Sequence, residues 1–219
     1  MATENLMVPT SLYRTVLEVA YKNKLSHLGS YFSSLGPIYD IYKNRMDPND
    51  IFILSCGHAA VAQYAVLEHV YGKHTAEQLF LKHGGHPHLD ENAELYCSTG
   101  SLGMGITVAV GRALANRDRT VHVLISDGEC AEGSVWEALQ YIDKAKIDNI
   151  VVYVNMNGYS AYDTVDWKRL NEKLQTFLPG VVAYKTEVST FPFLRGLNAH
   201  YHVMSEADYM LALELMEKP

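Results

Sequence analysis

The chain has 219 residues, of which 48% are hydrophobic and 20% are charged, and its formal net charge is -7. This composition excludes a disordered chain, and the length predicts one globular domain over residues 1–219. The negative charge and the lack of a basic stripe argue against a nucleic-acid-binding protein, so small molecules or proteins are the expected partners.

The cysteines and the N-terminal segment predict a soluble cytoplasmic protein. Cys56, Cys97 and Cys130 are scattered and odd in number, without a CxxC pair, which favours neither a disulfide framework nor a zinc knuckle. The N-terminus lacks a basic segment followed by a long apolar run, and no uncharged apolar stretch is long enough to span a bilayer. We therefore expect an untargeted protein in a reducing cytoplasm, with no membrane partner.

The first half of the chain predicts mostly helices. Residues 9–25 place Val16 and Val19 on one face, which predicts an amphipathic helix. Thr10 or Ser11 is expected to cap this helix. The further expected elements are a helix over 34–42, a buried strand over 51–55, helices over 59–71 and 75–83, a Gly- and His-rich loop over 84–97, and a helix that the segment 99–105 opens and that reaches residue 115.

The second half predicts strands that alternate with helices. Strand, acidic turn, helix and strand form a right-handed crossover unit, so we predict an α/β fold, a parallel sheet with helices on both faces. The expected elements are a strand over 121–125 that ends in Ser126-Asp127-Gly128-Glu129, a helix over 132–146, a strand over 150–154, a helix over 166–177, a strand over 181–186, and a terminal helix over 206–218 capped by Ser205.

Two oxygen-bearing side chains, Asp127 and Asn157, stand at the ends of two neighbouring predicted strands. Carboxylate, amide and main-chain carbonyl oxygens are ligands that Mg2+ or Ca2+ prefers, and Mg2+ held by few protein groups takes further ligands from phosphates. The helix over 132–146 would present its N-terminal amides to such a phosphate. The pair therefore predicts a metal-diphosphate site at the carboxyl ends of the strands, where open α/β sheets bind ligands.

Ten histidines are the second informative feature of the chain. Histidine donates and accepts protons near neutral pH, which suits hydroxylated or carbonyl substrates, although for any one of them a solvated loop position is the simpler interpretation. His86-Pro87-His88 also resembles half of a zinc site, but no acidic or thiolate partner stands at a convincing spacing. Six histidines occupy turn-like or strand-end positions: His27, His58, His86, His88, His200 and His202.

The segment TGSLGMG over 99–105 is a Gly-rich entry into a helix. Its glycines do not follow the GxGxxG spacing of a dinucleotide-binding loop, and no acidic residue ends a second strand about twenty residues later. Taken alone, the segment indicates a helix that packs closely against its neighbours.

Together these segments resemble the transketolase family. SDGE followed by Asn157 is similar to the family's thiamine diphosphate signature, Gly-Asp-Gly and a later Asn, and the flanking EGSVWEAL and DNIVVYVNMNG are close to transketolase sequences. TGSLGMG resembles the family's TGSLGQG. The segments SHLGS, LSCGHAA, GHP and NAH resemble its histidine motifs. The resemblance covers most of residues 10–165 and, loosely, 198–216, and it implies the thiamine diphosphate-binding fold.

The resemblance implies roles for the residues that match these motifs. Asp127 and Asn157 would be side-chain ligands of Mg2+ or Ca2+, and the Tyr159 carbonyl would be the main-chain ligand. Gly128 would contact the diphosphate through its backbone. The other implied residues are His58, Gly100 and Leu102 at the cofactor and His27, His86 and His200 as catalytic residues, whereas His88 and His202 have no match and are expected at the surface.

Two acidic residues follow the predicted metal ligand on the chain. Glu132 matches a family carboxylate that couples the two active sites of a dimer and is grouped with the cofactor-binding residues. An equally good interpretation is a first-turn Glu that the helix dipole stabilises. Glu129 is expected only to complete the turn.

The sequence departs from the family pattern in three places. Ser126 stands where the family usually has Gly, so its side chain would either crowd the diphosphate turn or donate its hydroxyl. Between Trp167 and Tyr184 the chain is short, and one βα unit of the family is expected to be missing. The family's KGKG-like stretch is unrecognisable in residues 187–191, on the substrate side.

The resemblance implies the N-terminal subunit of a split transketolase. In the family a separate pyrimidine-binding domain carries the activating Glu, so a second polypeptide would supply it in an α2β2 heterotetramer. The expected reaction is thiamine diphosphate- and Mg2+-dependent transfer of a two-carbon ketol unit from a ketose to an aldose, with a sugar or sugar phosphate as substrate. The alternatives are a subunit of a two-component 2-oxo acid decarboxylase or dehydrogenase, which do not share the four histidine motifs, and a non-catalytic remnant.

Overall fold

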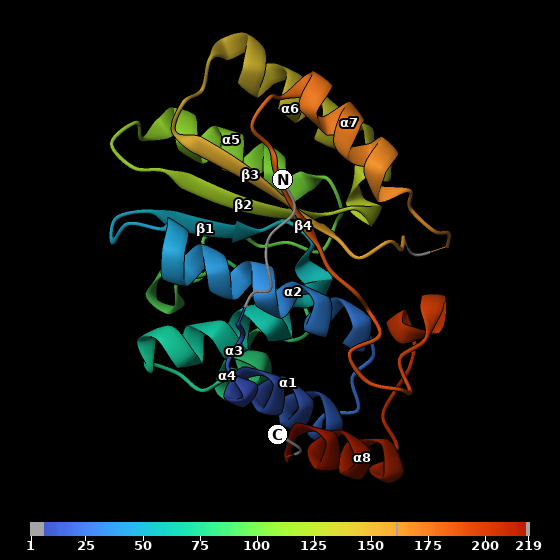
Figure 1. Cartoon of the computed structure of the whole chain (residues 1–219). Coiled ribbons are helices and arrows are strands. Elements are labelled where there is room, and N and C mark those ends of the chain that lie inside the picture. The colour runs from blue at the N-terminus through green and yellow to red at the C-terminus, as the bar shows by residue number, and fades with distance from the viewer. Residues whose placement is uncertain (1–6, 161, 218–219) are drawn as a thin grey trace.

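The computed structural model describes residues 7–160 and 162–217. The sheet at the centre of the protein has the strand order β1-β2-β3-β4, and every neighbouring pair is parallel. Figure 1 shows this sheet between two groups of helices, so the prediction of a parallel α/β fold is confirmed. The strands are β1 (Ile51–Leu54), β2 (Val121–Ser126), β3 (Ile150–Met156) and β4 (Val182–Lys185).

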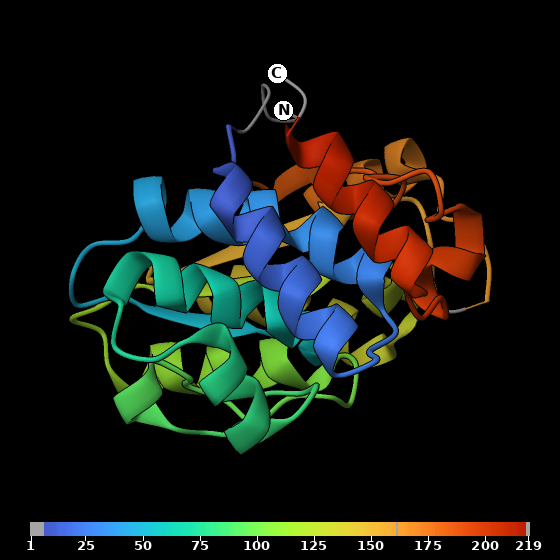
Figure 2. The ribbon, with the colours of Figure 1, turned by 90° about the horizontal axis from the view of Figure 1, so that it is seen from below.

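Helices cover both faces of the sheet, which agrees with strands whose residues are nearly all buried. In Figure 2, α1 and α8 lie side by side on the outer surface of the first group, and contacts join them. One face is covered by α2 (Leu28–Asp40) and α3 (Ala60–Tyr71), with α1 (Thr10–Lys22), α4 (Ala76–His83) and α8 (Glu206–Glu217) outside them, and the other face by α5 (Met104–Ala115), α6 (Gly133–Ala145) and α7 (Trp167–Phe177).

Each strand contributes to two hydrophobic clusters, because successive side chains point to opposite faces. On β1, Phe52 and Leu54 belong to the cluster of α1 to α4 and α8, whereas Ile51 and Ile53 belong to the cluster of α5 to α7. The register pairs Leu54 with Leu124 on β2. The segments that follow the first three strands therefore leave the sheet at the same edge.

The second helix is longer than its sequence pattern predicts. The helix expected over 34–42 begins at Leu28 and continues beyond Asp40 into a π-helical turn, Ile41–Arg45. It contains glycine and serine residues of low helix propensity, and Pro37 lies inside it. Nearly all of its residues are buried, many against α3, and this packing outweighs the low propensity.

The beginnings of three other helices follow their capping residues. Thr75 forms a reciprocal capping box at α4, and the Asp166 carboxylate accepts the first amides of α7. Ser205 accepts an amide of the first turn of α8, as predicted. The predicted cap of the first helix at Thr10 or Ser11 is wrong, because α1 begins without a side-chain cap.

A short connection joins α7 to β4, which pairs with β3 at the edge of the sheet. The helix predicted over 166–177 and the strand predicted over 181–186 are confirmed to within one residue at each end. In the described part of the chain no other strand lies between β3 and β4. The predicted final helix is α8, although residue 218 lies outside the described residues.

The three cysteines, Cys56, Cys97 and Cys130, are free and buried. None of them therefore takes part in a disulfide framework, as the odd number and the scattered positions predict. Over residues 7–160 and 162–217, no helix has both the length and the apolar character needed to cross a bilayer.

Candidate active site

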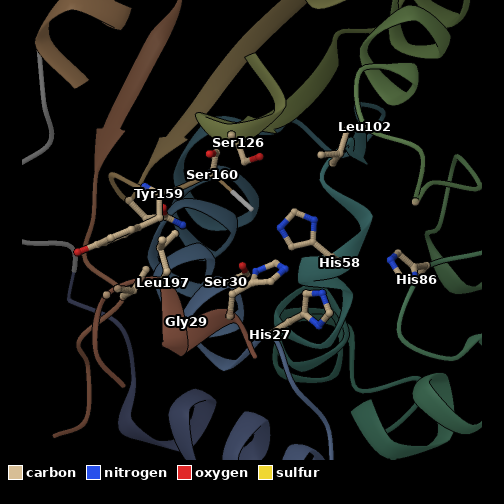
Figure 3. Close-up of a pocket in the computed structure, with 16 residues that line it drawn as sticks. His27, Gly29, Ser30, His58, His86, Leu102, Ser126, Tyr159, Ser160 and Leu197 are labelled. Carbon is tan, nitrogen blue, oxygen red and sulfur yellow. Dashed lines mark hydrogen bonds between the residues drawn. The ribbon is translucent and has the colours of Figure 1, made fainter. Parts of the chain in front are cut away.

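A cavity of about 230 Å3 opens at the edge of the sheet where β1, β2 and β3 end. Open parallel sheets bind ligands at this position. Figure 3 shows imidazoles on one side of the cavity and hydroxyl side chains on the other. Nine of the residues predicted for the site line it, together with seven others; the lining residues are His27, Gly29, Ser30, His58, His86, Gly100, Leu102, Ser126, Gly128, Asn157, Tyr159, Ser160, Val188, Gly196, Leu197 and His200.

Three imidazoles from distant segments form a cluster in this cavity. The ring centroids of His27 and His200 are 4.2 Å apart, and that of His58 lies 5.7 Å from each. His27 precedes α2 in the left-handed region with φ 67°, and its backbone N–H donates to the His200 carbonyl (2.8 Å). A non-glycine residue in this conformation is strained and needs its surroundings to hold it, which is typical of functional sites.

The imidazole cluster is neutral at neutral pH. Burial, with smaller contributions from the neighbouring imidazoles, lowers the pKa of His27 to about 4 and the pKa of His58 to about 3. Burial also lowers the pKa of His200. A neutral imidazole accepts a proton on one ring nitrogen and donates from the other, so the cluster can bind hydroxyl groups and exchange protons with them.

Asp127 lies behind the cavity wall, directly after β2, with 2% of its surface exposed. Its carboxylate accepts the N–H groups of Gly128 (3.0 Å) and Gly158 (2.7 Å). Burial raises the pKa of this carboxyl to about 7, although the amides act in the opposite direction. No basic side chain in the described chain pairs with it. A buried carboxylate without a positive partner fits a site that receives a cation.

Asn157 and Tyr159 follow β3 and adjoin the turn after β2. Asn157 Oδ1 accepts the Tyr159 N–H (3.0 Å). The Tyr159 carbonyl lies close to Gly128, because a Cβ on that glycine would be 3.3 Å from the carbonyl oxygen and 3.0 Å from Ser160 Cα. Carboxylate, amide and carbonyl oxygens thus come from adjoining turns, and with Asp127 they form a donor set that suits Mg2+ or Ca2+ and a diphosphate.

The zinc interpretation of His86-Pro87-His88 receives no support. Among residues 7–160 and 162–217, no three His, Cys, Asp or Glu side chains gather as a metal site. His88 is exposed, as expected. The expectation of a surface position is only partly right for His202, because its ring stacks on Phe193 and lies 3.1 Å from an Asp208 carboxylate oxygen.

The start of α6 lies outside the cavity, so the expectation that its amides face a phosphate is wrong. A 3-10 turn, Gly128–Ala131, stands between β2 and α6 and places Gly128 at the cavity instead. Glu132 is exposed just before α6 and does not line the cavity. Its predicted role toward a second chain stays a prediction.

Glu129 has a larger role than completing a turn, which is all that its sequence position suggests. It is fully buried, and its Oε1 accepts the Ser55 hydroxyl (2.5 Å) and the Gly103 N–H (2.6 Å). The Ser126 hydroxyl accepts the Glu129 N–H (3.1 Å), and the Ser126 N–H is directed at Glu129 Oε2 (3.4 Å). Ser-x-x-Glu is the sequence signature of such a capping box, so this local signal was available.

The segment 188–200 forms a wall of the cavity that no sequence pattern indicated. Val188 and Leu197 line the cavity beside His200. A Cβ on Gly29 would lie 2.9 Å from Ala199 Cβ, so the segment packs tightly on the start of α2. Among the described residues, no lysine or arginine lines the cavity, so its polar groups are imidazoles, hydroxyls, an amide and backbone atoms.

Comparisons with known proteins agree with this geometry. The family described as transketolase, thiamine diphosphate binding domain, matches residues 32–178. Transketolase from Pongo abelii is 40% identical over 136 residues, 56% of this chain and 22% of that protein. One of the named subunits of apulose-4-phosphate transketolase from Phocaeicola vulgatus is 31% identical over 171 residues, 70% of this chain and 60% of that protein, so the chain spans less than two thirds of either relative. The structure of transketolase from Leishmania mexicana shares the fold, with a TM-score of 0.76 at 19% identity over 100% of this chain and 42% of that chain.

Proposed function

The chain belongs to the family of transketolase thiamine diphosphate-binding domains, and from this premise we propose that it is the N-terminal subunit of a split transketolase. Residues 1–219 would form its single domain, in the cytoplasm. A second polypeptide with the pyrimidine-binding domain would complete the active site in an α2β2 assembly. The Phocaeicola vulgatus relative supports this division, because its name describes one subunit of a transketolase rather than a whole enzyme.

One observation carries the proposal: nine residues chosen from separate sequence motifs line one cavity. Thiamine diphosphate supplies, when bound, a nucleophilic carbon that attacks a ketose carbonyl. Asp127, Asn157 and the Tyr159 carbonyl are the proposed ligands of Mg2+. The other proposed cofactor contacts are Gly128 at the diphosphate, His58, Gly100 and Leu102 along the cavity, and Glu132 toward the partner chain.

His27, His86 and His200 are the proposed catalytic residues. They would bind sugar hydroxyls and move protons while a two-carbon ketol unit passes from a ketose to an aldose. The lowered pKa values of His27 and His200 support this role, because a neutral imidazole accepts a proton from one group and donates one to another.

Apolar side chains exposed near the cavity support a partner chain. Met104 and Val108 on α5 are 51% and 38% exposed, and Leu89 is 54% exposed. The Leu89 N–H donates to the Ser98 hydroxyl (2.8 Å), which ties its loop to the segment that enters α5. A second polypeptide that covers this region would bury these side chains and close the cavity.

Cofactor binding by the assembled enzyme tests the proposal. Calorimetry with thiamine diphosphate and Mg2+, on this chain with its co-purified partner, should detect binding that EDTA removes. Asp127→Ala should abolish it, because the variant lacks the charged metal ligand. Asp148→Ala is the matched control, since that carboxylate is 93% exposed and outside the cavity. A complete complex that binds no cofactor would refute the proposed function.

A further inference from the structure

We propose that the Ser126 hydroxyl donates a hydrogen bond to the diphosphate, at a position where the family usually has glycine. This inference rests on the proposed function, because it requires a diphosphate in the cavity. Ser126 ends β2, is 6% exposed and lines the cavity. In Figure 3 it lies with Ser160 at the end of the cavity opposite the labelled imidazoles of His27 and His86.

The Ser126 hydroxyl has a proton to donate. Its oxygen accepts the Glu129 N–H (3.1 Å), which uses one lone pair and fixes the orientation of the side chain. A hydroxyl is one donor and two acceptors, so its O–H stays available. No acceptor for this O–H lies among the residues that the structure describes. Because the side chain is nearly buried, an O–H without a partner is costly, and an acceptor brought by a ligand removes that cost.

The neighbouring donors at this end of the cavity are already engaged within the protein. The Ser160 hydroxyl both donates to and accepts from the Asp163 backbone. Ser126 is therefore the free donor beside the turn where the diphosphate is placed. The engaged backbone amides are those of Gly128, Tyr159 and Ser160, which donate to the Asp127 carboxylate (3.0 Å), the Asn157 side chain (3.0 Å) and the Asp163 carbonyl (2.8 Å).

The test is calorimetric binding of inorganic diphosphate with Mn2+ to the full chain. Ser126→Ala should weaken this binding about tenfold or more, as expected when a hydrogen bond to a charged group is lost. Ser126→Thr keeps a hydroxyl and should restore it. Ser205→Ala removes the same kind of cap at the start of α8, outside the cavity, and should leave diphosphate binding unchanged.

Binding of Mn2+ alone, measured from the electron paramagnetic resonance signal of free Mn2+, separates the donor from the cap. Loss of the cap alone would loosen the turn that carries Asp127, and Ser126→Ala would then weaken Mn2+ alone as much as Mn2+ with diphosphate. That result, or equal diphosphate binding by wild type and Ser126→Ala, would overturn the inference. A wild-type chain that binds no diphosphate would overturn the proposed function as well.

Discussion

At the scale of the residue, Glu129 joins three strand and helix ends that form the floor of the cavity. It accepts hydrogen bonds from Ser55 after β1 and from Gly103 before α5, and it shares the capping box with Ser126 after β2. Burial raises the pKa of this carboxyl. Its donors lie 74 and 26 residues away along the chain, so the sequence near Glu129 indicates the capping box but not these partners.

The histidine cluster predicts a pH dependence of stability. In the unfolded chain an imidazole has a pKa of about 6.5, whereas burial lowers the pKa of His58 to about 3. The unfolded state therefore binds more protons below the unfolded pKa. The stability that neutral His58 contributes is present above about pH 6.5 and is lost as the pH falls toward its folded value.

Urea unfolding of wild type and of His58→Gln at about pH 7.5 and about pH 5 measures this contribution. The unfolding free energy of the variant should fall less on acidification, by at most about 1.4 kcal/mol per pH unit. Equal losses in the two proteins would show that His58 is not buried as a neutral group.

At the scale of the element, a close approach of α5 to the end of β1 holds the Gly-rich segment in place. A Cβ on Gly105 would lie 2.6 Å from Ser55 Cα, and the Ile106 N–H donates to the Ser55 hydroxyl (3.1 Å). The expectation of a helix that packs closely is confirmed. Helix α2 shows the opposite case, since its early start at Leu28 depends on burial rather than on its own composition.

Two glycines on α5 give a matched prediction. Gly105→Ala should lower the unfolding free energy by about 1–3 kcal/mol, because its Cβ meets backbone that cannot move aside. Gly111→Ala should raise it by up to about 1 kcal/mol, because nothing lies within 4 Å and alanine favours the helix. Urea denaturation of both variants is the measurement. The same sign of change in both would contradict the close approach.

At the scale of the whole molecule, the two hydrophobic clusters share one sheet, which predicts a single cooperative unit. Trp136 and Trp167 pack against the cluster of α5 to α7, so tryptophan fluorescence reports on that face. Far-ultraviolet circular dichroism reports on helices of both faces. The two signals should give coincident urea transitions. Separate midpoints would contradict the prediction of one domain over residues 1–219.

The sequence by itself determined the parallel strands, most helices and the family. Strands buried on both faces are continuous apolar runs, and helix ends have capping residues, so these features are written in neighbouring residues. The motifs around His27, Asp127 and Asn157 also named most of the residues that line the cavity. Each motif is local, which is why it survives in a single sequence.

Only the tertiary structure decided which segments meet. The start of α2, the partners of Glu129, the free hydroxyl of Ser126 and the wall formed by 188–200 all depend on residues distant in the chain. Burial and hydrogen bonding between such residues follow from how the helices pack on the sheet. A local pattern indicates periodicity and caps, but the contacts that build the cavity exist only when both hydrophobic clusters have formed.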